Sequence, residues 1–149
     1  MTNDKEIRTH NFEIEFDSCS RNEAFARGVI IAFLSELDPI LEDLIEVKTA
    51  VSEAVSNCII HAYRKSDGRI HMLCDVSDDG YLTITIKDNG VGIENVEKAM
   101  LPLFTTGGTE RSGMGFTVME TFMDSVTVTS NPGEGTEVVM TKKLDVGYV

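Results

Sequence analysis

The sequence predicts an α+β two-layer sandwich, with helices packed on one face of a mostly antiparallel mixed sheet. Three observations predict it. Two helical segments follow one another near the start, strand-like runs lie on both sides of them, and turns of the hairpin type join strands in two places. Helices and strands grouped in this way, rather than strictly alternating, are typical of the α+β class. The 149 residues suit a single domain, which would bury about 70% of its unfolded surface.

The first strand and the first helix are predicted from residues 11–37. Residues 11–16 alternate apolar and polar side chains, which places one set of apolar residues on one side of a strand: Phe12, Ile14 and Phe16. The run from Ser20 to Glu23 matches a capping box that opens a helix through about Leu37. We expect the buried stripe of this helix to be formed by Phe25, Val29, Ala32, Phe33 and Leu37.

The second helix is predicted to carry two different sides. Pro39 suits its first turn, because proline is favoured where a helix begins. Its core side consists of apolar residues at helical spacing: Leu44, Val47, Val51, Val55, Cys58 and Ile59. Glu53, Asn57 and His61 recur every four residues along another side. That polar side is available for chemistry, although for His61 a structural or capping role is favoured over catalysis.

The second half of the chain predicts two hairpins around an irregular stretch. Strand-like runs at 69–76 and 81–87 flank one turn, and runs at 125–130 and 136–142 flank a second. Between the hairpins, a helix is expected at 113–124. The stretch 92–112 has little regular pattern, and a long irregular segment in a compact domain is usually functional.

Composition excludes several classes of protein. A net charge of −12 without a cluster of basic residues disfavours direct binding of nucleic acid. No apolar run is long enough to span a bilayer, so we expect a cytoplasmic protein without a membrane segment. The three cysteines are not in CxxC spacing, which argues against a disulfide framework and a zinc site. Residues 1–10 and 145–149 are expected to be flexible ends.

Asp88, Gly90 and Gly92 predict the base-binding part of a nucleotide site. They follow the strand-like run 81–87, so that Asp88 lies at its end. A carboxylate can accept a hydrogen bond from the exocyclic amine of adenine. Guanine has no amine at that position. Glycines allow a positive φ and a close approach of the backbone to the base. By itself a DxGxG pattern is more often a turn, but three further polar or glycine-rich blocks accompany it.

Glu53 and Asn57 predict the phosphate part of the site. The amide oxygen of Asn57 is a hard ligand of the kind that Mg²⁺ accepts, together with waters and phosphate oxygens. Glu53, one helical turn earlier, would face the same phosphates and take a proton from an attacking nucleophile. The backbone of Gly113, Met114, Gly115 and Phe116, at the start of a helix, suits a polyphosphate. Neither a P-loop nor a complete Rossmann motif occurs in the sequence.

A glycine-flanked loop at 102–108 is predicted to close over the phosphates. Its Thr105 and Thr106 are candidate nucleotide contacts, and Arg111 either reaches the γ-phosphate or faces solvent. Thr136 either belongs only to a hairpin turn or touches the edge of adenine.

In this order the four blocks resemble the ATP site of the superfamily that joins gyrase, sensor histidine kinases and the MutL repair protein. A closer resemblance is to the sporulation anti-sigma F factor family, serine kinases of the histidine-kinase-like ATPase fold. It extends from about residue 11 to 144. The motifs that carry it are FAR at 25–27, EAVSN at 53–57, DNGVG at 88–92, PLFTT at 102–106, ERSGMGF at 110–116 and METFMD at 119–124.

The resemblance implies an ATP- and Mg²⁺-dependent kinase that forms a homodimer. It implies that the kinase holds a sporulation sigma factor inactive and phosphorylates an anti-anti-sigma factor on a serine. The family's general base corresponds to Glu53, its magnesium ligand to Asn57, its adenine-binding residue to Asp88 and its lid arginine to Arg111. Arg27 matches an arginine that contacts the partners.

Three alternatives remain at this point. A general stress-response anti-sigma kinase has the same chemistry and a different sigma partner. A nucleotide-gated module would sequester a partner without transferring phosphate, although such a binder does not need the base Glu53. The ATP domain of a sensor histidine kinase fits less well, because the chain has no dimerisation helix with a phosphoacceptor histidine.

Overall fold

The computed structural model describes residues 6–62, 68–93, 95–101 and 115–147. Five strands form one sheet in the order β1-β2-β3-β5-β4. Every pair of neighbours in this sheet runs antiparallel, so the predicted mostly antiparallel sheet is confirmed, without a parallel pair among the described strands. The strands are β1 (Thr9–Asp17), β2 (Arg69–Ser77), β3 (Tyr81–Asp88), β4 (Ser125–Asn131) and β5 (Gly135–Lys143).

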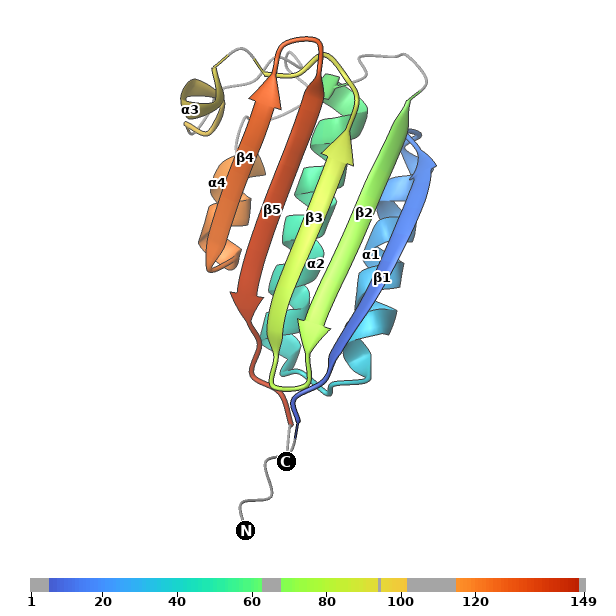
Figure 1. The fold of residues 1–149 in the computed structure, drawn as a ribbon, viewed down its shortest axis with the longest axis vertical. Coiled ribbons are helices and arrows are strands. Elements are labelled where there is room, and N and C mark those ends of the chain that lie inside the picture. Colours follow the sequence, from blue (N-terminus) through green and yellow to red (C-terminus); the bar gives the residue numbers. More distant parts are fainter. Residues whose placement is uncertain (1–5, 63–67, 94, 102–114, 148–149) are drawn as a thin grey trace.

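The three longer helices cover one face of the sheet (Figure 1). They are α1 (Arg21–Ser35), α2 (Leu41–Asn57) and α4 (Gly115–Phe122). A π-helical turn, η1 (Cys58–Ala62), continues α2, and a short helix, α3 (Val96–Ala99), was not predicted. The described residues therefore form the two layers that the sequence predicts. None of the helices in the described ranges is long and apolar enough to cross a membrane.

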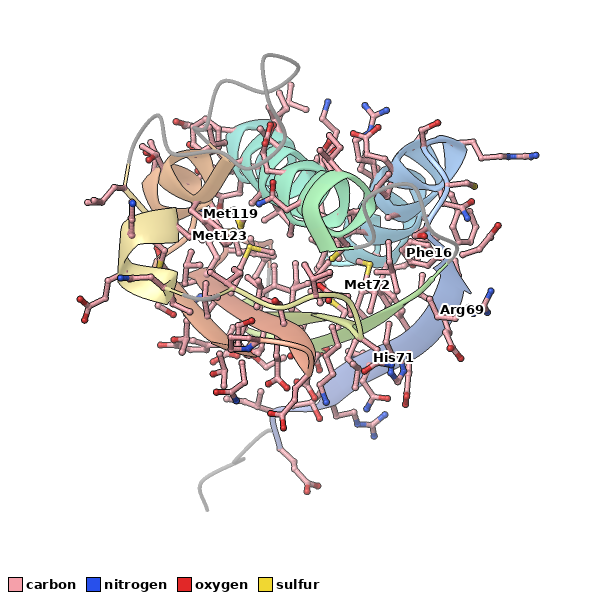
Figure 2. All side chains as sticks on the ribbon, turned by 90° about the horizontal axis from the view of Figure 1, so that it is seen from above. Phe16, Arg69, His71, Met72, Met119 and Met123 are labelled. Carbon is pink, nitrogen blue, oxygen red and sulfur yellow. The ribbon has the colours of Figure 1, made fainter. Side chains whose placement is uncertain are left out.

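The core fills the space between the two layers. Ile30 of α1 and Val51 of α2 are fully buried, as are Met72 of β2 and Ile84 of β3. Figure 2 shows the side chains of Met72, Met119 and Met123 between the helices and the sheet, whereas His71 lies on the open face. The expected apolar side of β1 is also confirmed, since Phe16 is buried and Phe12 and Ile14 pack against the core.

The predicted buried stripe of α1 was wrong in its first part, whereas Phe33 and Leu37 are partly buried and pack against the core, as expected. The buried residues are Ala26, Ile30 and Leu34, which recur every four positions, whereas Phe25 is 49% exposed. The predicted set lies beside this line and is partly covered or exposed. The capping box was also wrong, because Ser20 makes no side-chain cap hydrogen bond. Glu23 is instead engaged with α2, where it accepts a hydrogen bond from the hydroxyl of Ser52.

The described parts of both expected flexible ends take part in backbone pairing. Thr9 and His10 belong to β1. Pro39 lies before α2 rather than in its first turn, and it forms an isolated β-bridge with Val146. The amide of Ile40 donates to the carbonyl oxygen of Asp145 at 3.0 Å. The segment 145–147 thus lies against the start of α2.

Candidate functional site

Four segments that are distant in sequence meet at one end of the sandwich. The last turn of α2, the end of β3, the β4–β5 turn and the first turn of α4 all lie at the upper end in Figure 1. Each of the four predicted blocks contributes residues to this end. The antiparallel topology explains the convergence, because β3 ends where β5 begins.

The side chains of Glu53 and Asn57 both lie beside Gly115. A Cβ atom added to Gly115 would lie 3.2 Å from both Oδ1 and Nδ2 of Asn57, and 3.3 Å from Oε2 of Glu53. Glu53 and Asn57 are one turn apart on α2, and Gly115 is the first residue of α4. A side chain at position 115 would push the carboxylate and the amide away. The structure therefore gathers a carboxylate, an amide and the start of a helix around a glycine.

Asp88 lies at the end of β3 and is only 7% exposed. Its Oδ1 accepts a hydrogen bond from the amide of Gly90 at 2.9 Å, and its Oδ2 accepts one from the thiol of Cys58 at 3.4 Å. Burial raises the pKa of Asp88 above its ordinary value, while hydrogen bonds from Gly90, Cys58 and the backbone of Thr136 act in the opposite direction. The carboxylate is thus desolvated and held by several donors.

Two glycines bring the β4–β5 turn against the end of β3. Gly92 has a φ of +75° and Gly135 one of +89°, both in the left-handed region that favours glycine. A Cβ at Gly135 would overlap with the backbone oxygen of Asp88, and one at Gly92 with that of Asn131. Gly92 adopts the positive φ that was predicted. Close backbone packing around Asp88 therefore depends on glycine at both positions.

Thr136 lies directly opposite Asp88 in the β3–β5 register. Its hydroxyl oxygen is 2.8 Å from that of Ser130, which also donates to the carbonyl oxygen of Gly135. The amide of Ile93 donates to Ser130 at 2.8 Å. Sequence reasoning missed Ser130, although the hairpin register, which pairs it with Thr136, offered a signal.

Cys58 was predicted to be a buried core thiol, and it is buried. Its contact with Asp88 was missed, although its position directly after Asn57 is visible in the sequence. Phe116, a predicted nucleotide contact, is partly buried against the core.

Several predicted residues lie outside the described residues. They are Thr105, Thr106, Arg111, Gly113 and Met114, and the side chain of His61 is also not described. The backbone of His61 lies in the π-helical turn η1.

Arg27 lies away from the glycine-rich blocks, on α1. Its side chain is 38% exposed, and its Nε is 3.3 Å from Oε1 of Glu23, although without the geometry of a good hydrogen bond. Glu23 also accepts from Ser52 on α2, the residue that precedes Glu53. Arg27 is therefore held by an ion pair and still reaches the surface.

Comparison with known proteins assigns the family. Residues 20–142 match the family model of the histidine kinase-like ATPase domain. An anti-sigma F factor from Caldanaerobacter subterraneus subsp. tengcongensis is 56% identical over 89% of this chain and 92% of its own length. One from Clostridium acetobutylicum is 53% identical over 91% and 94%, respectively. This chain belongs to the anti-sigma F factor family.

Solved structures agree with this fold. The crystal structure of the RsbU and RsbW domains of a Mycobacterium tuberculosis protein matches with a TM-score of 0.67 and 19% identity, over 94% of this chain and 34% of that chain. A mycobacterial sensor histidine kinase, MprB, matches with a TM-score of 0.57 and 14% identity, over 91% and 99%. The histidine-kinase-like ATPase fold predicted from the motifs is confirmed, and membership of this family implies that the domain binds ATP.

Proposed function

We propose that this protein is a cytoplasmic, ATP- and Mg²⁺-dependent serine kinase that inhibits the sporulation sigma factor F. In this proposal it forms a homodimer and phosphorylates its anti-anti-sigma factor on a serine. The proposed nucleotide site rests on one observation: two consecutive residues near the end of α2 lie against two different segments of the chain. Asn57 lies beside Gly115 at the start of α4, and Cys58 contacts Asp88 at the end of β3. One helix end thereby joins a phosphate region to a base region.

Asp88 supplies the recognition of adenine. While ionised, its buried carboxylate offers only acceptors, and the exocyclic amine of adenine is a donor. Guanine carries an oxygen at the same position and would face the carboxylate with an acceptor. Gly90 and Gly92 have no side chains, so the adjoining backbone can approach the base closely. Thr136 lies opposite Asp88 and borders the same edge of the base.

Asn57 and Glu53 suit the phosphates and their metal ion. Mg²⁺ prefers oxygen ligands and takes few from protein, and the Asn57 amide oxygen lies where a side chain at position 115 would intrude. When bound, the ion would neutralise charge on the phosphate oxygens. The amides at the start of α4, from Gly115 and Phe116, add donors to the same region.

Glu53 is the proposed general base. The serine hydroxyl oxygen of the substrate forms a bond to the γ-phosphorus as the bond from that phosphorus to the β–γ bridging oxygen breaks. The hydroxyl proton passes to the carboxylate of Glu53, and ADP leaves with the bridging oxygen. The place of Oε2 next to Gly115 supports a position of Glu53 beside the phosphates. Arg111, Thr105, Thr106, Gly113 and Met114 complete the site in this proposal by resemblance to the family.

A phosphotransfer assay tests this function directly. The protein, ATP labelled at the γ-phosphate and Mg²⁺ are incubated with a purified anti-anti-sigma factor, and the labelled residue is identified. We expect label on a serine and a loss of about 10²- to 10⁴-fold in rate for Glu53→Ala, with ATP binding retained. A variant with more than half the parent rate would rule out Glu53 as the base. Retention of the sigma factor without any label would instead identify a sequestering module.

Arg27 tests the proposed partner surface. Reversing its charge should prevent capture of the sigma factor, because attraction at the contact becomes repulsion. Arg21→Glu makes the same charge change at an exposed position of α1 and serves as the matched control. Arg27→Glu should leave the ATP titration unchanged. Equal capture by both variants would remove Arg27 from the partner surface.

A further inference from the structure

The helix that carries Glu53 and Asn57 changes its form just before Cys58. The α-helical part ends at Asn57, and the π-helical turn η1 spans Cys58–Ala62. The amide of Cys58 bonds to the carbonyl oxygens of both Ala54 and Val55. Such single π-turns occur often at functional sites. Here the turn begins at the residue whose side chain contacts Asp88.

The thiol of Cys58 is buried and remains a donor. Cys58 is 5% exposed, and its Sγ lies 3.4 Å from Oδ2 of Asp88. A thiol is a hydrogen-bond donor, so the sulfur can donate its proton to the carboxylate of Asp88.

The donors around Asp88 leave an acceptor position of its carboxylate for a ligand. An ionised carboxylate offers about four acceptor positions on its two oxygens. Gly90 occupies one on Oδ1, Cys58 occupies one on Oδ2, and the backbone of Thr136 provides a third hydrogen bond. Terminal rotation of an aspartate is otherwise loose. Donors on both oxygens fix the plane of the carboxylate, so that its remaining acceptor position has a defined direction.

We propose that Cys58 is a positioning residue for base recognition, whose thiol fixes the Asp88 carboxylate for the exocyclic amine of adenine. This inference rests on the proposed ATP site at Asp88. It assigns Cys58 a role beyond filling the core, and it makes selectivity for adenine depend on a residue that does not touch the base.

Substitutions at Cys58 separate a donor from a space-filling side chain. Cys58→Ser keeps a donor of similar size, whereas Cys58→Ala and Cys58→Val remove it with a smaller and a larger side chain, respectively. Cys74→Ala is the matched control, because Cys74 is equally buried and pairs across the sheet with Phe12 and Ile84. Thermal unfolding of each variant reports any loss of the fold.

The measurement is the affinity of the full-length protein for Mg²⁺–ATP and for Mg²⁺–ITP, in which an oxygen replaces the exocyclic amine. We expect Ala and Val at position 58 to weaken ATP binding by about two- to tenfold. ITP binding should change less, Ser should keep the parent preference for ATP, and Cys74→Ala should leave both affinities unchanged.

A purely structural role gives a different pattern. Affinities for ATP and ITP would then change together, and the polar Ser would disturb the apolar surroundings at least as much as Val. That result, or an unchanged ATP preference in both Ala and Val, would overturn the inference. The proposed function is tested separately by Asp88→Asn. If this change also leaves the preference for ATP unaltered, adenine recognition by Asp88 itself fails.

Discussion

The two ends of the sandwich use glycine in the same way and differ in what surrounds it. At the end of β3, Gly135 has a positive φ and lies against the backbone of Asp88. At the opposite end, Gly80 also has a positive φ and lies against the backbone of Leu144. The first glycine adjoins a buried carboxylate, whereas the second closes a turn. A glycine pattern alone therefore does not distinguish a ligand site from a hairpin.

The lower end in Figure 1 is closed by the chain's own hydrogen bonds. The amide of Leu144 donates to the carbonyl oxygen of Gly80 at 2.8 Å, and the amide of Asp145 donates to Oδ2 of Asp43 at 2.7 Å. At the upper end, Asn57 and Glu53 face a glycine, and Asp88 keeps acceptor capacity beyond its three donors. In the proposed function the upper end takes the nucleotide, whereas the lower end stabilises the fold.

The largest difference between the ends is expected from removal of a carboxylate charge. Asp88→Asn should lower ATP affinity by about ten- to a hundredfold, because a hydrogen bond to an ionised acceptor is lost and a donor then faces the adenine amine. Asp43→Asn is the control at the lower end, since Asp43 also accepts a hydrogen bond from a backbone amide. Its ATP titration should match the parent. Equal effects of the two changes would break the comparison.

Alanine substitution of the two glycines, Gly135 at the upper end and Gly80 at the lower end, should give a smaller difference in ATP affinity between the ends. Gly135→Ala and Gly80→Ala both create an overlap with backbone at a positive φ, so each should destabilise the fold by about 1–3 kcal/mol. Only Gly135→Ala should also weaken ATP binding, since it displaces the backbone of Asp88. Denaturant unfolding and nucleotide titration of the folded variants measure the two effects. Loss of ATP affinity in Gly80→Ala would count against separate roles.

The pH dependence of ATP binding should reveal the buried carboxyl of Asp88. Burial raises its folded pKa above the unfolded value of about 3.9. As pH falls through the folded pKa, the carboxylate gains a proton, loses an acceptor position and binds adenine less well. Protonation in this window favours the folded state, because the folded carboxyl binds the proton more tightly. Affinity should thus decline without unfolding, and Asp88→Asn should lack this decline.

Much of the fold could be predicted because its signals are local. The alternation in β1 and the turns at 77–80 and 131–135 involve neighbours in sequence, and α2 shows its core side through regular spacing. The stripe of α1 could not be predicted in this way. Phe25 lies at the rim of the core, where its ring packs edge-on against that of Phe16, with the ring centroids 6.0 Å apart. Ala26 takes the buried position instead.

The candidate site was predictable in its parts and less so in its connections. Glu53, Asn57 and Asp88 were recognisable from residue type and spacing. The role of Cys58 was not, because its contact joins residues 30 positions apart, and a lone cysteine after a helical run is typical of a core. The link between Glu23 and Ser52 is likewise a contact between two helices that neither sequence pattern indicates.

Hydrogen exchange with and without Mg²⁺–ATP tests the difference between the two ends most directly. The account predicts added protection in the last turn of α2, in residues 88–93 and in the β4–β5 turn. Residues 40–45, 77–82 and 143–147 at the opposite end should exchange at unchanged rates. Protection centred on that opposite end, with none around Asp88, would contradict the assignment of the nucleotide site.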